Sequence, residues 1–205
     1  MTDVRRIVVI TAGLSDPSST RLLADLLRDA TREALSVREV PAEVEVVELR
    51  PLAHALTDHL LTGFASGDLA EAQRKVAEAD AVIAVTPVFS ASYSGLFKTF
   101  FDVLEQGALD GTPVLVAATA GTARHSLVLE HALRPLFSYL HAVVVPTGVF
   151  AATEDFGSRS ELDRRIARAA GELADLVASR EASDRGDQFD RDLAAMGDFE
   201  NLLRG

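Results

Sequence analysis

The sequence predicts an α/β protein in which a parallel sheet of five strands is covered by helices on both faces. Short apolar runs with little alternation recur along the chain, as expected for strands that are buried on both faces. Segments with apolar residues at helical spacing separate these runs, so strands and helices alternate. With 205 residues, the chain is long enough for one domain with one sizeable core.

The predicted strands are runs of four to six residues made mostly of valine, isoleucine, leucine and alanine, the composition of buried strands. In chain order they cover residues 7–12, 44–49, 81–85, 113–118 and 142–145.

The predicted helices have apolar residues three and four positions apart, which places these residues on one face. In chain order the helices cover residues 19–35, 52–61, 68–78, 95–106, 123–140 and 160–180. Phe97, Phe100 and Phe101 of the fourth helix are predicted as core residues rather than ligand contacts. Pro135 lies inside the fifth helix and cannot donate a hydrogen bond to the carbonyl of His131, so a kink or bulge is expected there.

Five parallel strands with helices between them fit a flavodoxin-like three-layer sandwich with strand order 2-1-3-4-5. We expect residues 1–180 to form this single domain. Residues 181–205 differ, because seven acidic residues accompany three arginines and the apolar residues are sparse. Two interpretations of this acidic tail stay open: a mobile segment, or a segment that docks on a neighbouring subunit.

The composition excludes several classes of function. A formal net charge of −11 argues against nucleic-acid binding, which requires a basic surface. The absence of cysteine excludes disulfides, thiolate catalysis and cysteine-ligated metals, and the histidines have no metal-ligand spacing, so no metal is expected. No apolar run is long enough to span a bilayer and no signal-peptide pattern is present, which predicts a cytoplasmic location.

The turn after the first strand has the composition of a phosphate-binding site. Gly13 is expected to adopt an unusual backbone angle, and Arg21 adds one positive charge. Amide hydrogens at the start of the following helix and the helix dipole favour a phosphate there. Four hydroxyl side chains lie close to the start of this helix, whereas an N-cap needs only one. They belong to Ser15, Ser18, Ser19 and Thr20.

The loop after the third strand offers amides, hydroxyls and aromatic rings, which suit a flat ligand with polar edges. Pro87 is expected to end the strand, and Gly95 to let the next helix start close to a ligand. The candidate contacts are Pro87, Val88, Phe89, Ser90, Tyr93 and Ser94. Lys98 and Asp102, four residues apart, are expected to form a surface ion pair.

A third loop follows the fourth strand. Gly121 permits close approach of the backbone, and hydroxyls and a histidine lie beside it. The candidate contacts are Thr119, Ala120, Gly121, Thr122 and His125. In a doubly wound sheet, the loops after strands one, three and four meet at one carboxyl edge, beside the topological switch point. One loop suits a phosphate and two bracket a flat ring, which predicts FMN as the ligand.

Three motifs of the chain resemble those of the NAD(P)H-dependent FMN reductases, a flavodoxin-like family that includes the reductase partners of two-component flavin monooxygenases. They are Ser18-Ser-Thr-Arg21, the segment from Thr86-Pro-Val-Phe to Ser-Gly-Leu-Phe-Lys98 with Asp102, and Thr119-Ala-Gly121 with His125 and Leu133-Arg-Pro135.

The resemblance implies a role for each motif. Residues 18–21 would hold the FMN phosphate, residues 87–90 would border the ring and ribityl chain with Tyr93 and Ser94 close by, and residues 119–122 would approach the pyrimidine edge. It also implies a homodimer or homotetramer whose active site is completed by a neighbour. The helix over 123–140 lies in the tetramer interface of related reductases, so we hypothesise that His131 lies at a local distortion in a subunit contact.

The predicted activity is hydride transfer from NADPH or NADH to N5 of FMN, with reduced flavin passed to a monooxygenase. The cofactor supplies this chemistry, so no catalytic acid or base is assigned. Two alternatives stay open: an FMN-containing quinone or azo-dye reductase, and a flavodoxin-type electron carrier. The sequence does not decide between NADH and NADPH.

Overall fold

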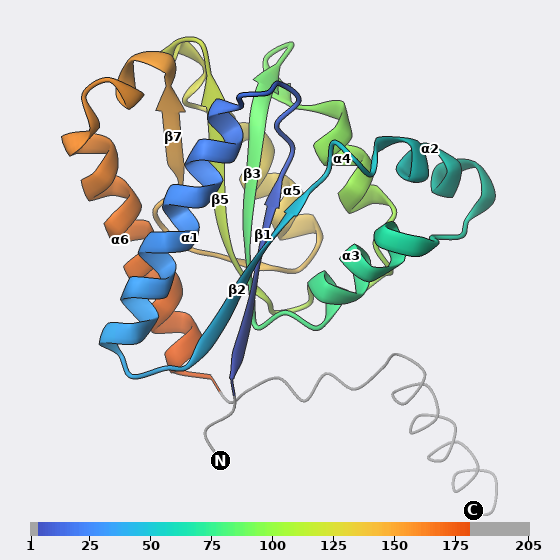
Figure 1. Ribbon diagram of the computed structural model, residues 1–205, viewed down its shortest axis with the longest axis horizontal. Helices are drawn as coiled ribbons and strands as arrows, with labels where there is room; N and C mark the ends of the chain where they lie inside the picture. Colours follow the sequence, from blue (N-terminus) through green and yellow to red (C-terminus); the bar gives the residue numbers. More distant parts are fainter. Residues whose placement is uncertain (1–3, 181–205) are drawn as a thin grey trace, which may run out of the picture.

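Seven strands form one sheet in the computed structural model, which describes residues 4–180 (Figure 1). The strands are β1 (Arg5–Thr11), β2 (Ala42–Glu48), β3 (Ala81–Phe89), β4 (Ser92–Tyr93), β5 (Pro113–Ala120), β6 (Val143–Val144) and β7 (Val149–Ala152). The parallel strands follow the order β2-β1-β3-β5, and β6 and β7 both pair with the free side of β5.

This is the predicted order 2-1-3-4-5 with the fifth strand divided in two. The predicted number of five strands was wrong, because β7 continues the sheet after a break and β4 folds back antiparallel on β3. The amides of Val143 and Val145 donate to β5, but the next amide on that side, that of Thr147, donates to the side chain of Glu172 instead, so the pairing of the fifth strand is interrupted there.

The helices and helical turns alternate with the strands as predicted. They are α1 (Ser19–Val37), α2 (Ala53–Thr62), α3 (Gly67–Ala77), α4 (Gly95–Asp102), η1 (Ala123–His125), η2 (Leu129–Leu133), α5 (Arg134–Tyr139), η3 (Thr153–Phe156) and α6 (Arg159–Ala178). The acidic tail predicted over 181–205 lies outside the described residues.

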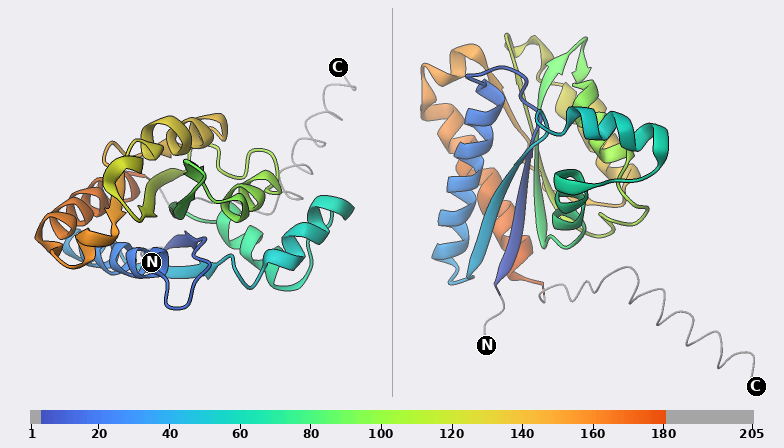
Figure 2. Two further views of the ribbon diagram at one scale, coloured as in Figure 1. Left: turned by 90° about the horizontal axis from the view of Figure 1, so that it is seen from above. Right: turned by 45° about the vertical axis from the view of Figure 1, so that its right-hand side comes forward.

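Helices cover both faces of the sheet, which makes three layers (Figures 1 and 2). One face packs against α1 and α6 through residues such as Leu27 and Leu173. The other packs against α3, α4 and α5, where Phe97, Phe101 and Phe137 form a cluster of tilted and edge-on rings. The prediction that the phenylalanines of α4 belong to the core is confirmed. Within residues 4–180, none of the helices combines the length and apolarity that crossing a bilayer requires.

The single helix predicted over 123–140 is instead three pieces. A 3₁₀ turn (η1) is followed by a π-helical turn (η2) in which the amide of Arg134 donates to the carbonyl of Leu129, five residues back. An ordinary α-helix, α5, then starts with Pro135 as its second residue. The expected distortion near Pro135 is therefore confirmed, and it takes the form of a π turn just before the proline.

The break in the fifth strand is held from both helical layers. Arg134 of α5 donates to the carbonyls of Val145 (2.9 Å) and Pro146. From the other face, the carboxylate of Glu172 in α6 accepts hydrogen bonds of 2.7 Å from both the amide and the hydroxyl of Thr147. Burial alone would raise the pKa of Glu172, but these two hydrogen bonds and Arg168 outweigh it and lower the pKa.

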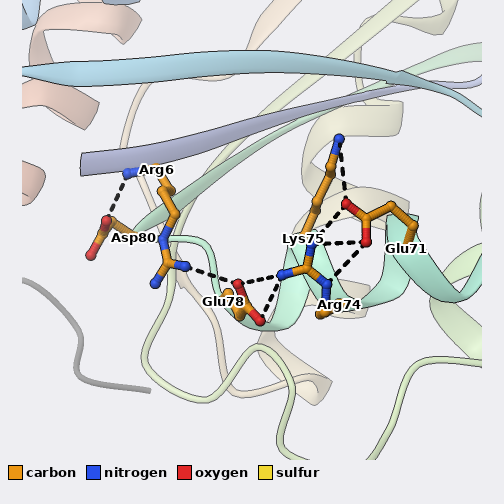
Figure 3. A network of polar contacts seen from close by, with 6 residues as sticks. All are labelled: Arg6, Glu71, Arg74, Lys75, Glu78 and Asp80. Carbon is orange, nitrogen blue, oxygen red and sulfur yellow. Dashed lines mark hydrogen bonds and ion pairs between the residues drawn. The ribbon is translucent and has the colours of Figure 1, made fainter. Parts of the chain in front are cut away.

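At the amino edge of the sheet, a network of ion pairs joins α3 to β1 (Figure 3). Glu78 accepts from Arg6 at 2.8 Å and from Arg74 at 2.9 Å, and Arg74 also binds Glu71. The hydrogen bonds from Arg74 hold the pKa of Glu71 below its ordinary range. These side chains are largely exposed, so each ion pair contributes little to the stability of the fold. The network also lies at the opposite end of β1 from the predicted ligand site.

Candidate functional site

The turn between β1 and α1 is folded tightly on itself. Ser18 is the N-cap of α1, and its hydroxyl accepts a hydrogen bond of 3.2 Å from the amide of Arg21. A Cβ on Gly13 would come within 2.1 Å of the Ser18 hydroxyl oxygen. A side chain at position 13 would therefore displace the Ser18 hydroxyl from its capping position. The predicted unusual backbone angle was wrong, since Gly13 is not among the residues of positive φ.

Among the described residues, two amides at the start of α1 have no partner within the helix. The first intrahelical bond runs from the amide of Leu22 to the carbonyl of Ser18, and the amide of Arg21 is taken by the cap. The amides of Ser19 and Thr20 come before these bonds, so they are donors without an intrahelical partner. The side chains of Ser15 and Ser19 are exposed beside them. The turn therefore presents neutral donors at the positive end of a 19-residue helix.

Arg21 does not stand free beside this turn. Its guanidinium binds Asp25 at 3.1 Å on the next turn of α1, and it also binds Glu48 at the end of β2. Two carboxylates thus neutralise the one charge that the sequence offered for a phosphate.

β3 runs past Pro87 instead of ending there, which corrects the sequence prediction. Pro87 pairs in register with Thr119 of β5, and the strand continues to Phe89. The carbonyl of Val85 accepts a hydrogen bond from the amide of Ala12, so the backbone of Val85 faces the side of β3 on which β1 lies. The backbone of Pro87, two residues later, faces the same side. The paired part of β1 has already ended at Thr11, so the missing proline N–H costs no ladder bond.

Beyond Pro87, β3 and β4 form a hairpin that projects from the sheet (Figure 1). The pair Phe89 and Ser92 closes a two-residue turn in which Ser90 has φ 48° and Ala91 has φ 67°. Positive φ at both central residues defines a type I′ turn, the form that matches the twist of paired strands. Phe89 is 49% exposed at the start of this turn.

The base of the hairpin is fixed by buried hydroxyls. Thr86 accepts a hydrogen bond of 3.1 Å from the amide of Ser94. The hydroxyl of Ser94 caps α4 by accepting from the amide of Phe97 at 3.2 Å. The ring of Tyr93 packs 5.9 Å from that of Phe97. Ser94 thus acts as a structural cap, and Thr86 is a supporting residue that was not among the predicted contacts. The expected exposed ion pair of Lys98 and Asp102 is present on α4.

At the end of β5, Thr119 is buried, and the residues after it lead out to solvent. Its hydroxyl oxygen lies 2.7 Å from that of Thr20 in α1. Ala120 is partly buried, and Gly121, Thr122 and His125 are exposed. A Cβ on Gly121 would meet nothing within 4 Å, so open space lies beside the backbone there, as it does at Gly95.

The three predicted loops therefore meet at one edge of the sheet, at the top of Figure 1 and facing the viewer in the left view of Figure 2. They present a helix start with open amides, a projecting hairpin with an aromatic tip, and a loop with open space beside a glycine. This combination can receive a ligand with a phosphate at one end and a flat ring at the other.

Comparison with known proteins identifies the family. Residues 5–157 match the NADPH-dependent FMN reductases. The chain belongs to this family. It is 37% identical over 184 residues to the FMN reductase (NADPH) of Pseudomonas aeruginosa, an alignment that covers 88% of this chain and 96% of that protein. It is 39% identical over 181 residues to the NADH-dependent FMN reductase SfnE of Pseudomonas putida, covering 86% and 94%.

A solved structure agrees with this result. The X-ray structure of an oxidoreductase from Corynebacterium diphtheriae superposes with a TM-score of 0.84 at 52% identity, covering 87% of this chain and 99% of that one. The predicted family, the flavodoxin-like fold class and the assignment as an NAD(P)H-dependent FMN reductase are confirmed.

Proposed function

We propose that FMN binds at the carboxyl edge with its phosphate on the start of α1 and its ring between the β3–β4 hairpin and the end of β5. The observation that carries this proposal is the pair of amides at Ser19 and Thr20 that have no partner within the helix, set beside the exposed residues Ser15 and Ser19. Helix starts with unpaired amides favour phosphate groups. When bound, FMN supplies the redox chemistry by accepting hydride from NADPH or NADH at its N5 atom.

The remaining residues of the site orient and shield the ligand. Residues 87–90 and Tyr93 border the ring, and Ala120, Gly121, Thr122 and His125 lie along its pyrimidine edge. When FMN is bound, backbone amides near that edge would stabilise negative charge on the ring, and none of these roles requires a side chain that gains or loses a proton. The protein contributes distance, orientation and exclusion of water.

The test of the phosphate site is FMN binding by Ser19→Ala. Loss of one hydroxyl donor to a charged phosphate should weaken FMN binding about tenfold. Thr57→Ala is the matched control, because Thr57 is an exposed helical hydroxyl on α2. Equal FMN affinity in the two variants would refute the placement of the phosphate.

We further propose that the reaction delivers reduced FMN to a flavin-dependent monooxygenase in the cytoplasm. Oxidation of NADPH and NADH by the purified protein, with and without added FMN, tests the step on which this proposal depends, namely that FMN is a substrate and leaves the protein when reduced. A rate that requires added FMN and saturates with it supports FMN as a substrate. A yellow protein that turns over only with a quinone or azo dye would favour the alternative reductase, and bound FMN without nucleotide oxidation would favour an electron carrier.

We also propose that the chain forms a homodimer or homotetramer through the segment from η1 to β6. Its outward side carries Leu127 (61% exposed), His131, Pro135 and Tyr139 (83% exposed), at intervals of four residues. An exposed stripe of this kind is typical of a protein interface. Light scattering should give a dimer or tetramer for the wild type and a smaller species for Tyr139→Asp. An unchanged mass would refute a contact at this stripe.

A further inference from the structure

Two threonines that were predicted to contact FMN form a hydrogen bond with each other in the structure. Thr20 and Thr119 are 2% and 3% exposed, and their hydroxyl oxygens lie 2.7 Å apart. This is a normal length for a hydrogen bond between hydroxyls. We call this pair the threonine bridge.

The threonine bridge joins two parts of the site that neither sequence nor strand pairing connects. Thr20 is the second residue of α1, directly after the turn proposed for the phosphate. Thr119 is the last residue but one of β5, directly before the loop proposed for the pyrimidine edge. The two residues are 99 positions apart, and β3 lies between β1 and β5 in the sheet. The bridge therefore links the elements on the two sides of β3.

The position of the bridge sets it apart from the packing of the core. Seven polar side chains are buried in the described part of the chain. Five of them gather at the carboxyl edge, and these are Thr11, Thr20, Thr86, Ser94 and Thr119. Below them, the face of the sheet that carries Thr119 is apolar, with Leu115 and Ala117 on the same strand. The hydrogen bond thus ties α1 to β5 at the level of the ligand site, at the upper end of this apolar face.

We propose that the threonine bridge is a positioning device that sets the spacing between the phosphate end and the ring end of the FMN site. This inference rests on the proposed placement of FMN. Neither hydroxyl contacts the flavin. Instead, the bridge fixes the start of α1 relative to the end of β5, so that one rigid ligand engages both at once. Preorganisation of this kind improves affinity by reducing the cost of ordering the site on binding.

Valine substitutions test the bridge, because valine has nearly the shape of threonine without the hydroxyl. The variants are Thr20→Val, Thr119→Val and the double variant. Each removes the same single hydrogen bond, so FMN affinity should fall about fivefold to tenfold in all three, with no further loss in the double variant. The double variant removes both hydroxyls of the bridge, so neither is left buried without its partner, and its thermal stability should be closest to that of the wild type.

The ratio of FMN affinity to riboflavin affinity distinguishes a positioning role from a purely structural one. Riboflavin is FMN without the phosphate, so it engages only the ring end of the site. The valine variants should bind riboflavin as the wild type does, and the ratio of FMN to riboflavin affinity should fall. Thr20→Ser and Thr119→Ser keep the hydroxyls and should restore the ratio.

Each contrary outcome has a distinct meaning. Additive losses of FMN affinity in the two single variants would mean that the hydroxyls contact FMN separately, which overturns the inference. Equal losses for FMN and riboflavin, or lower stability with unchanged FMN affinity, would also overturn it. A wild-type protein that binds FMN no better than riboflavin would refute the proposed phosphate site itself, before any threonine variant is made.

Discussion

Replacing Ala91 by glycine should stabilise the protein. Ala91 has φ 67° in the turn of the β3–β4 hairpin. A residue with a Cβ in this left-handed conformation costs roughly 1–2 kcal/mol. Glycine avoids that cost, but it loses more conformational freedom on folding, which offsets roughly 0.5–1 kcal/mol of the gain. The net expectation is a gain of about 0.5–1 kcal/mol. For a chain of this size, this gain raises Tm by about 1–4 °C.

The matched control is the same substitution where the backbone is helical. Ala167 is exposed in the middle of α6, and glycine there should lower stability by about 1 kcal/mol. Urea unfolding and thermal melts of Ala91→Gly and Ala167→Gly should therefore change in opposite directions from the wild type. If Ala91→Gly destabilises as much as Ala167→Gly, the hairpin does not have a type I′ turn.

Two further predictions concern buried polar groups. Thr31→Val should stabilise by about 1–2 kcal/mol, because the buried Thr31 hydroxyl has no hydrogen-bond partner among the described residues. Thr57→Val, at an exposed helical position, should change the unfolding free energy by less than about 0.5 kcal/mol. Thr147→Val should cost about 1–2 kcal/mol near pH 7, because it removes the hydroxyl donor to Glu172. Since the pKa of Glu172 is lowered by folding, its contribution is complete above its ordinary pKa of 4.5 and is lost as the pH falls through the lower, folded value. Urea unfolding from pH 7 to pH 3.5 should therefore show the cost of Thr147→Val shrinking, and a constant difference would contradict this assignment.

The sequence was sufficient to predict most of the fold, because buried parallel strands and amphipathic helices leave strong patterns. Helix α1 was predicted from residue 19 to 35 and ends at Val37. The fifth strand was harder, since its two parts are only two and four residues long and are separated by a proline. The break is held by Arg134 and Glu172 from opposite layers, contacts that no local pattern reveals.

The meeting of the three loops at one edge of the sheet was predictable, but the hydrogen-bond partners of their hydroxyls were not. The ends of parallel strands converge at one edge by topology alone, so the loops could be placed from the strand order. Which hydroxyl faces the ligand depends instead on partners far apart in sequence, as for Thr20 and Thr119. Ser18 and Ser94, which were predicted as FMN contacts, both cap helices in the structure. Excess hydroxyls near a helix start therefore indicate a site without identifying its contacts.

The pairing of Arg21 has a consequence for how FMN binds. Because Asp25 and Glu48 neutralise this arginine, we infer that the phosphate is held by the amides of Ser19 and Thr20 and by neutral hydroxyls. Attraction between opposite charges weakens as salt screens it, whereas hydrogen bonds to neutral donors are much less affected. The net charge of −11 repels an anionic flavin, and salt screens this repulsion as well. FMN affinity should therefore stay constant or rise between about 0.05 M and 0.5 M NaCl. A steep fall would mean that Arg21 leaves its carboxylates to bind the phosphate, and Arg21→Gln should then remove the salt dependence.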